Sequence, residues 1–352
     1  MALDLHIGTV KGARVAALLG DDGLTALAAE PVESPDLTGA VYRARLLRYD
    51  ATADHCLLDL GSVEAVLPGK PPAENIFPVQ IRRVARDGKR SEVTRDVVLA
   101  GRFLMAAPGI SDVKTSSRVR NGRVQRDRAN NLGLTSGWIL RRTFAEASDD
   151  KVRDDAAHLT DLLGRLDQAG GPGLLIPALP LWCRVVMDEA EPSRLFGAEP
   201  ILARAEADLT ALGLEPVAVN SIVDLDEVIA PVCRSDVELP RGGRITIEPT
   251  RALTAIDVDA GGSGREAANQ AAVRAIAKQL RLRNIGGIVV IDLVSQKSDW
   301  RPIVDRFRDL LADDPARTSI AGGVSPLGLL QMSRERRGYS LAEALAHTDG
   351  GS

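Results

Sequence analysis

The most regular alternation of apolar and polar residues lies at 253–259, in the stretch LTAIDVD. Strand side chains point to opposite faces in turn, so this period of two predicts a strand. Ile256 and Val258 share the face that would be buried, and Asp257 and Asp259 share the face that would be exposed. Two carboxylates therefore project from one side of the predicted strand.

A turn, a helix and a second strand are predicted next. The residues GGSG at 261–264 predict a flexible turn, and Ser263 is a candidate helix cap. The following segment has a four-residue apolar spacing that predicts an amphipathic helix, with apolar positions at Ala268, Ala272, Ile276 and Leu280. The run IVVIDLV at 288–294 is apolar except for Asp292 and predicts a strand covered on both faces.

A strand, a helix and a second strand predict a crossover unit, in which the ends of parallel strands lie side by side. Asp257 and Asp292 would then converge on one cation. A hard ion such as magnesium suits them, because it keeps several waters and takes only one or two carboxylates. The alternative is that Asp257 and Asp259 are solvated residues at a strand end and Asp292 caps a loop. Spacing alone leaves both interpretations open.

Short strands dominate the amino-terminal part of the chain. Residues 1–35 predict a small β-meander, which is too small to close a core alone. Residues 38–101 contain several short strands separated by turn residues, a pattern typical of a small barrel. Alternation returns within 170–233. The apolar stripe formed by Ile303, Phe307, Leu310 and Leu311 predicts a helix that Pro315 ends.

Composition places the chain in an ordinary class. Its 352 residues suffice for two or three domains, and 45% hydrophobic with 26% charged residues is typical of a soluble globular protein. The sequence has no apolar run of about twenty residues and no signal-peptide layout, so we expect a cytoplasmic protein. Cys56, Cys183 and Cys233 are too few and too widely spaced for a disulfide framework or a zinc site, and we expect buried thiols.

Charge is distributed unevenly along the chain. Residues 95–142 hold ten basic and three acidic residues, so this block carries +7 while the whole chain carries −4. The remainder is therefore −11, and such asymmetry favours a polyanionic partner over a small substrate. The alternative is a solvated surface with an arginine-rich composition.

Several motifs in order carry a family resemblance. ALTAIDVDAGG, AIAKQLRLRNIGGIVVIDLV, DPAR and SPLGLLQMSRER resemble the catalytic region of the bacterial ribonuclease E/G family over about a hundred residues. The resemblance implies that Asp257 and Asp292 bind a metal ion in a deoxyribonuclease-I-like catalytic subdomain. Asp259 falls where the family usually has an asparagine that helps to position the attacking group.

The resemblance also implies an α+β multidomain fold. An OB-fold barrel, together with a phosphate-sensor region, would be inserted into a ribonuclease-H-like scaffold, and the deoxyribonuclease-I-like subdomain would follow. The expected parts are the first scaffold part (1–35), the OB-fold domain (36–101), the basic sensor region (102–168), the second scaffold part (169–236) and the catalytic subdomain (237–345).

The motif GWILRRT resembles the family pocket for an RNA 5′-monophosphate, where an Arg-Thr pair contacts the phosphate. Arg141 matches the arginine, Arg142 replaces the threonine, and Thr143 lies one residue late. Arg317 of DPAR occupies a position that the family also assigns to this pocket. Alternatively, Arg141 and Arg142 simply flank a strand. Three nearby arginines are further candidates for binding RNA phosphates: Arg118, Arg120 and Arg123.

The predicted OB-fold surface departs from the family pattern. Barrels of this kind grip single-stranded nucleic acid by stacking bases on aromatic rings. Leu57 and Val66 stand where the family carries phenylalanines, so we expect weak stacking and a grip that depends on charge.

We therefore predict an endoribonuclease that hydrolyses single-stranded RNA by magnesium-assisted attack of water, in RNA processing or decay, with manganese as the alternative ion. The competing hypotheses are an RNA-binding protein with weak or no cleavage, and a metal-dependent phosphoesterase for small nucleotides. The family's zinc motif and small dimerisation domain are not found in the sequence, so we expect no zinc and either a monomer or a zinc-independent dimer.

Overall fold

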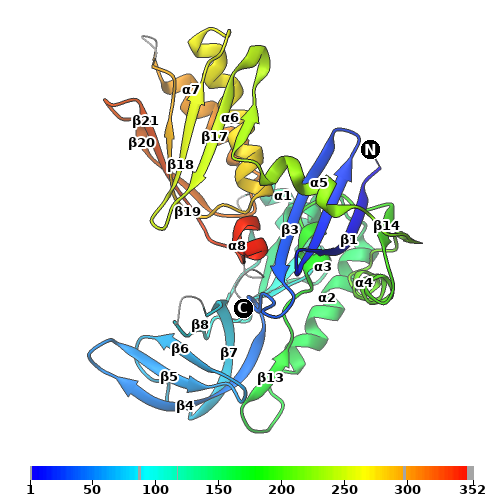
Figure 1. Cartoon of the computed structure of the whole chain (residues 1–352). Helices are drawn as coiled ribbons and strands as arrows, with labels where there is room; N and C mark the ends of the chain where they lie inside the picture. The colour runs from blue at the N-terminus through cyan, green and yellow to red at the C-terminus, as the bar shows by residue number, and fades with distance from the viewer. Residues whose placement is uncertain (1, 86–88, 117, 296–298, 347–352) are drawn as a thin grey trace. The chain divides into compact units, whose positions relative to one another are not determined.

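The computed structural model describes residues 2–85, 89–116, 118–295 and 299–346, and Figure 1 shows its helices and strands. The chain forms two compact units, each assembled from separated stretches. The two-sheet unit consists of Met1–Ser34, Ala190–Ala203 and Pro216–Ser352. The barrel unit consists of Pro35–Glu189 and Arg204–Glu215.

The first sheet of the two-sheet unit has the strand order β15-β14-β1-β2-β3. Its strands are β1 (Asp4–Val10), β2 (Ala13–Gly20), β3 (Gly23–Pro31), β14 (Arg194–Gly197) and β15 (Val217–Asn220). The three first strands form an antiparallel meander, and β14 pairs with β1 in parallel. Helices α5 (Leu225–Cys233) and α8 (Leu341–Ala346) contribute apolar side chains to its core. Its assignment to a ribonuclease-H-like scaffold stays a prediction.

The second sheet carries the strands that the sequence singles out, in the order β16-β17-β18-β19-β21-β20. Its strands are β16 (Asp236–Glu238), β17 (Arg244–Pro249), β18 (Thr254–Asp259), β19 (Gly287–Asp292), β20 (Thr318–Val324) and β21 (Leu329–Arg334). Helix α6 (Arg265–Leu282) connects the parallel strands β18 and β19, as the crossover pattern predicts, and helix α7 (Arg301–Leu311) follows β19. Turn η2 (Pro240–Gly242) precedes β17.

Both helices pack on the same apolar face of this sheet. Ile256 and Val258 of β18 and Val289 and Ile291 of β19 are buried together with the apolar stripes of α6 and α7. The expectation that β19 is covered on both faces is wrong, because Ile288 on its other face is 54% exposed. A run of valine and isoleucine reports strand preference, but it does not report how many faces are covered.

The turn before α6 also differs from its prediction. Gly264, and not Ser263, is the N-cap of the helix, and no side chain caps it. The hydroxyl of Ser263 instead donates to the Pro240 carbonyl oxygen at 3.2 Å. Gly261 has a φ of 51°, and a Cβ atom there would lie 2.4 Å from the backbone of Gly242. The turn is therefore packed tightly against η2.

The barrel unit begins with a closed five-strand barrel, consistent with the predicted OB-like domain. Its strands are β4 (Val41–Asp50), β5 (His55–Asp59), β6 (Glu64–Pro68), β7 (Ile76–Arg83) and β8 (Ser91–Thr94). The order β4-β5-β6-β8-β7 closes because β4 also pairs with β7. The buried side chains of Leu58, Phe77 and Ile81 belong to its core.

A small α/β region completes the barrel unit. Its four-stranded sheet has the order β11-β12-β10-β9, with β9 (Leu99–Ala100), β10 (Leu104–Ala106), β11 (Lys114–Thr115) and β12 (Trp138–Leu140). Strand β13 (Gly173–Ile176) pairs with β4 of the barrel. The helices are α1 (Gly122–Asn131), η1 (Arg142–Glu146), α2 (Asp149–Gly164) and α3 (Leu181–Val186), and α4 (Ile201–Thr210) lies between β14 and β15 in the chain.

The cysteines and the helices bear on two further expectations. Cys56 and Cys183 are buried, and burial raises the pKa of the Cys183 thiol to about 12. Cys233 is exposed at the end of α5, so the prediction of three buried thiols is wrong at this position. Across the described part of the chain, we find no helix with the length and apolar character needed to cross a bilayer.

Candidate functional site

Asp257 and Asp292 lie in register on the parallel strands β18 and β19. Both side chains are exposed, on the sheet face opposite to α6 and α7. Neighbouring strands are roughly 4.8 Å apart, so two carboxylates at the same level can reach one ion. Within residues 2–85, 89–116, 118–295 and 299–346, no hydrogen bond or ion pair holds either carboxylate.

The neighbours of this pair leave it open. Thr246 on β17 is in register with Asp257, and Leu329 on β21 is in register with Asp292. The Thr246 hydroxyl donates to Asp236 at 2.7 Å, which directs it away from Asp257. Over the described residues, no group of three or more His, Cys, Asp and Glu side chains is placed to hold a metal ion. A pair of oxygen ligands fits a magnesium ion that keeps most of its waters.

Asp259 has a different environment from the other two aspartates. One of its carboxylate oxygens accepts a hydrogen bond from the backbone N–H of Gly261 at 3.0 Å. The other lies 3.7 Å from Nε of Arg244, its in-register neighbour on β17. Both side chains are more than half exposed, so this ion pair is weak. Asp259 is thus held by its own turn and by Arg244, next to the two in-register carboxylates.

Asn269 is a supporting residue of this site that was not predicted from the sequence. It is fully buried in α6, where its side chain donates to the Val294 carbonyl oxygen at 2.9 Å and accepts from the Val294 N–H at 3.0 Å. Val294 follows Asp292 by two residues, so Asn269 fixes the path of the chain as it leaves β19. A polar residue within the apolar stripe of a predicted helix is the sequence signal that would have found it.

A buried ion pair supports the far edge of the same sheet. Asp314 and Arg334 form two hydrogen bonds of 2.8 Å, and their side chains are 0% and 2% exposed. Arg334 also donates to the Ile285 carbonyl oxygen, just before β19. The motif MSRER, which carries part of the family resemblance, therefore also contains a structural arginine.

In the barrel unit, the predicted phosphate-binding residues make internal contacts. Nη2 of Arg141 lies 3.0 Å from Oδ1 of Asp188, and Nη1 of Arg118 lies 3.4 Å from the same oxygen. Arg142 donates to the Asp188 carbonyl oxygen. The Thr143 hydroxyl donates to the Arg102 carbonyl oxygen at 2.6 Å. These four candidate residues thus gather around internal acceptors, and three of them contact Asp188.

Two further arginines of the basic block are internal as well. Arg102 is buried and donates to the carbonyl oxygens of Val186 and Glu189. Arg128 binds Asp149 and two backbone carbonyl oxygens. Seven of the ten basic residues in this block therefore engage partners within the described part of the chain, namely Arg95, Arg102, Arg118, Arg126, Arg128, Arg141 and Arg142. The net charge of +7 overstates the free positive charge of the block.

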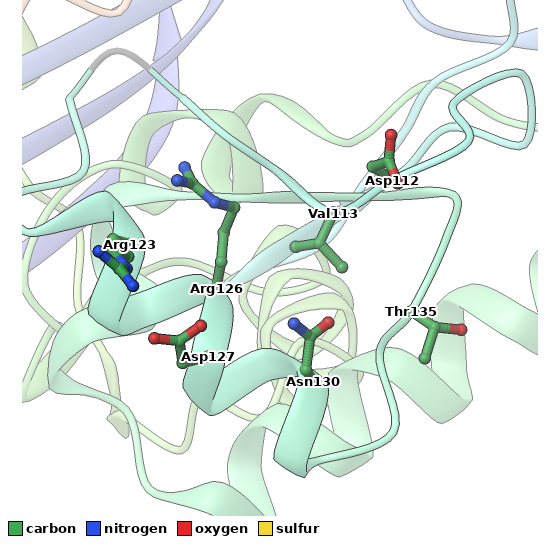
Figure 2. Close-up of a pocket in the computed structure, with 7 residues that line it drawn as sticks. All are labelled: Asp112, Val113, Arg123, Arg126, Asp127, Asn130 and Thr135. Carbon is green, nitrogen blue, oxygen red and sulfur yellow. The ribbon is translucent and has the colours of Figure 1, made fainter.

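The remaining predicted arginines are exposed to solvent: Arg120, Arg123 and Arg317. Arg317 precedes β20 in the two-sheet unit, and Arg141 lies in the barrel unit. Arg123 lines an open cavity of about 390 Å³ beside α1. Figure 2 shows Arg123, Arg126, Asp127 and Asn130 projecting from α1, with Asp112 and Val113 on the neighbouring extended segment. Two arginines and two aspartates give this cavity a balanced charge.

The barrel surface places the substituted aromatic positions together. Leu57 on β5 and Val66 on β6 are directly opposite each other, and both side chains are half-buried. Arg48 on β4 is in register with Leu57 and is exposed. A continuous patch therefore crosses three strands, with one cation and two aliphatic side chains but no ring for base stacking.

Comparisons with known proteins agree with the motifs. Residues 201–337 match the sequence model of the Ribonuclease E/G family. The chain is 28% identical to Ribonuclease G of Salmonella typhimurium, over 76% of this chain and 61% of that protein. It is 27% identical to Ribonuclease E of Buchnera aphidicola, over 94% of this chain and 40% of that protein, and 27% identical to Ribonuclease G of Escherichia coli, over 76% and 61%.

The chain spans about two fifths to three fifths of the length of these relatives. The matched region 201–337 contains β18, α6 and β19, and with them Asp257, Asn269 and Asp292. Together, the ordered motifs, the family match over 201–337 and the named relatives show that this chain is similar to the ribonuclease E/G family.

Proposed function

We propose that this protein is a magnesium-dependent endonuclease that cuts single-stranded RNA. The observation that carries the proposal is the in-register pair Asp257 and Asp292, exposed at the same level of two parallel strands without an internal partner among the described residues. An exposed pair of like charges is costly without a cation, and such a pair in a ribonuclease E/G relative is best explained as a metal site.

The role of the two carboxylates is to hold and orient the ion at the sheet edge. A bound magnesium ion supplies Lewis-acid stabilisation of the phosphodiester and a more acidic water for in-line attack. Manganese has the same preference for oxygen ligands and is the alternative ion. Asn269 contributes by fixing the backbone after Asp292.

Asp259 contributes negative charge where the family usually has a neutral amide. In this chain, Arg244 lies beside its carboxylate and offsets that charge. The hydrogen bond from Gly261 turns the carboxylate toward its own loop. Asp259 therefore has a positioning role through Arg244 and the Gly261 turn, while Asp257 and Asp292 act as the metal ligands.

RNA binding is proposed to depend on phosphate contacts more than on base stacking. Arg120, Arg123 and Arg317 are exposed and can reach phosphate oxygens, whereas Leu57 and Val66 offer no aromatic ring. Binding governed by phosphate contacts weakens steeply as salt concentration rises. Affinity for a short single-stranded RNA should therefore fall markedly between 50 and 200 mM salt, roughly in proportion to the number of phosphates neutralised.

The test is cleavage of a labelled, 5′-monophosphorylated single-stranded RNA with magnesium, comparing wild type with Asp257→Asn and Asp292→Asn. Each substitution should lower the cleavage rate on the order of a thousandfold, or ~4 kcal/mol, because half of the proposed ligand set loses its charge. RNA binding measured by anisotropy should be retained. Asp236→Asn is the matched control, since Asp236 is an exposed aspartate on the same sheet two strands from Asp257.

The alternative function is RNA binding with weak or no cleavage. It is favoured by Asp259 in the asparagine position and by the missing aromatic side chains at Leu57 and Val66. Wild-type protein that binds the RNA but leaves it intact with either metal would establish this alternative. Asp259→Asn would then be the first substitution with which to test whether cleavage can be restored.

A further inference from the structure

Asp188 lies where the predicted phosphate-binding arginines converge. It follows helix α3, and its carboxylate oxygen Oδ1 is 3.0 Å from Arg141 and 3.4 Å from Arg118. The side chains of Arg141, Arg118 and Asp188 are 11%, 17% and 17% exposed, so the contact is only partly open to solvent. A carboxylate held between two guanidinium groups has the charge and the oxygen geometry of a bound phosphate.

The backbone around Asp188 is fixed as well. Arg142 donates to the Asp188 carbonyl oxygen, and Arg102 donates to the carbonyl oxygens of Val186 and Glu189. Four arginines thus surround residues 186–189. Arg102 and Arg142 bind main-chain carbonyl oxygens there, whereas Arg118 lies against the carboxylate. Arg141 binds the carboxylate and also donates to the Met187 carbonyl oxygen at 3.4 Å. A ligand anion can displace the Asp188 side chain without unmaking the backbone contacts of Arg102 and Arg142.

We propose that Asp188 is a specificity-determining residue that competes with RNA for Arg118 and Arg141, and that this competition favours a terminal 5′-monophosphate over internal phosphodiesters. The inference rests on the proposed function, because it deepens the phosphate-recognition part of that function. According to this inference, an acidic residue and not an additional cation determines the preference for a 5′-monophosphorylated RNA end.

The physical reason is an exchange of anions. An internal phosphodiester carries one negative charge, so replacing the single charge of Asp188 with it gains no net attraction from the two arginines. A terminal monophosphate carries between about 1.5 and 2 negative charges at pH 7 and offers three oxygens. The electrostatic attraction to the two arginines therefore increases when a terminal phosphate replaces the Asp188 carboxylate. Internal phosphates are left to the exposed arginines.

The test is equilibrium binding of two fluorescent decamers that differ only in a 5′-monophosphate or a 5′-hydroxyl, measured by anisotropy in EDTA with the full chain. Wild type should bind the monophosphorylated decamer more tightly. Asp188→Asn should raise affinity for the 5′-hydroxyl decamer about tenfold, the effect of roughly one charge-pair exchange, and should narrow the ratio between the two RNAs.

Asp149→Asn is the matched control. It removes the same charge from a carboxylate that pairs with a different arginine of the same unit, Arg128, at 2.6 Å. If both variants change the two affinities equally and leave their ratio as in wild type, the proposal is overturned. If Asp188→Asn does not fold, Asp188→Glu keeps the charge but shifts the carboxylate by one methylene. A changed ratio in that variant supports the proposal, and an unchanged ratio overturns it.

Failure of this inference can be told apart from failure of the proposed function. Cleavage of the 5′-hydroxyl decamer with magnesium is measured separately and depends on Asp257 and Asp292, not on Asp188. A wild type that cleaves but shows no preference for the monophosphate loses the Asp188 proposal and keeps the endonuclease. A wild type that binds with a preference but does not cleave loses the endonuclease and keeps Asp188.

Discussion

Two regions of the molecule differ in how their charged side chains are paired: the carboxylates of Asp257 and Asp292, and the arginine cluster around Asp188. In the first region two like charges face solvent without an internal partner among the described residues. In the second, opposite charges are already paired inside the protein. Charge left unpaired and exposed is poised for a ligand, whereas charge that is already paired stabilises the fold and must be released before it can bind one.

This comparison predicts that internal arginines matter for stability more than exposed ones. Arg102→Met should lower the free energy of unfolding by roughly 2–4 kcal/mol, because two backbone carbonyl oxygens lose charged donors in a buried position. Urea unfolding is the measurement. Arg120→Met, at an exposed arginine of the same block, should change stability by less than about 0.5 kcal/mol. Equal losses in both variants would contradict the distinction.

Asn269 tests whether the open carboxylate pair depends on buried support. Asn269→Ala should reduce cleavage roughly 10–100-fold in protein that is still folded, because Val294 loses both hydrogen bonds and the end of β19 shifts. The rate should be measured at saturating RNA, with folding checked by circular dichroism. Gln270→Ala, the next residue on the same helix, serves as the control and should keep the wild-type rate.

Asp155 tests a buried carboxylate in the barrel unit. It accepts hydrogen bonds from the backbone N–H groups of Arg102, Phe103 and Leu104 at 2.8–2.9 Å. Burial raises the pKa of this carboxyl, although the three N–H groups oppose the shift. The folded state therefore holds the proton more tightly than the unfolded state does. Ionisation of Asp155 then costs stability as pH rises from the ordinary carboxyl pKa of about 3.9 through the raised value.

Asp155→Asn removes this titration, and it also turns amide hydrogens toward backbone donors. The variant should be less stable than wild type, and the difference should be largest near pH 4 and smaller at pH 8. Urea unfolding of both proteins across this range checks it. A difference that grows with pH would show that the pKa of Asp155 is lowered in the folded protein.

The smallest expected effect concerns the barrel surface. Val66→Phe places a ring beside Leu57 on the half-buried patch, where one base could stack. Affinity for single-stranded RNA should rise by about 1 kcal/mol, the lower end of the range for a stacked base. Val217→Phe, an exposed position on β15, is the control and should leave affinity unchanged. Equal affinity for Val66→Phe and wild type would mean that RNA does not cross this patch.

Much of the fold was predictable where local pattern and tertiary contact agree. The alternation at 253–259, the helical spacing after it and the short barrel strands each appear as predicted, because side-chain period is fixed by backbone geometry. The covered faces of β19 and the cap at Ser263 were predicted wrongly. These two features depend on neighbouring elements. Helices α6 and α7 pack on the same face of the sheet, and the Ser263 hydroxyl donates to the Pro240 carbonyl oxygen in η2.

The sequence by itself determined the resemblance to the ribonuclease E/G family, the strand that carries Asp257 and the crossover that brings Asp292 beside it. The sequence also locates the arginine-rich block at 95–142, but its net charge of +7 does not distinguish paired arginines from unpaired ones. Only the tertiary structure decided which of these arginines are engaged, because Asp188 lies 46 to 70 residues from its partners in the chain. Pairing over such separations depends on three-dimensional packing, which no local spacing of residues records.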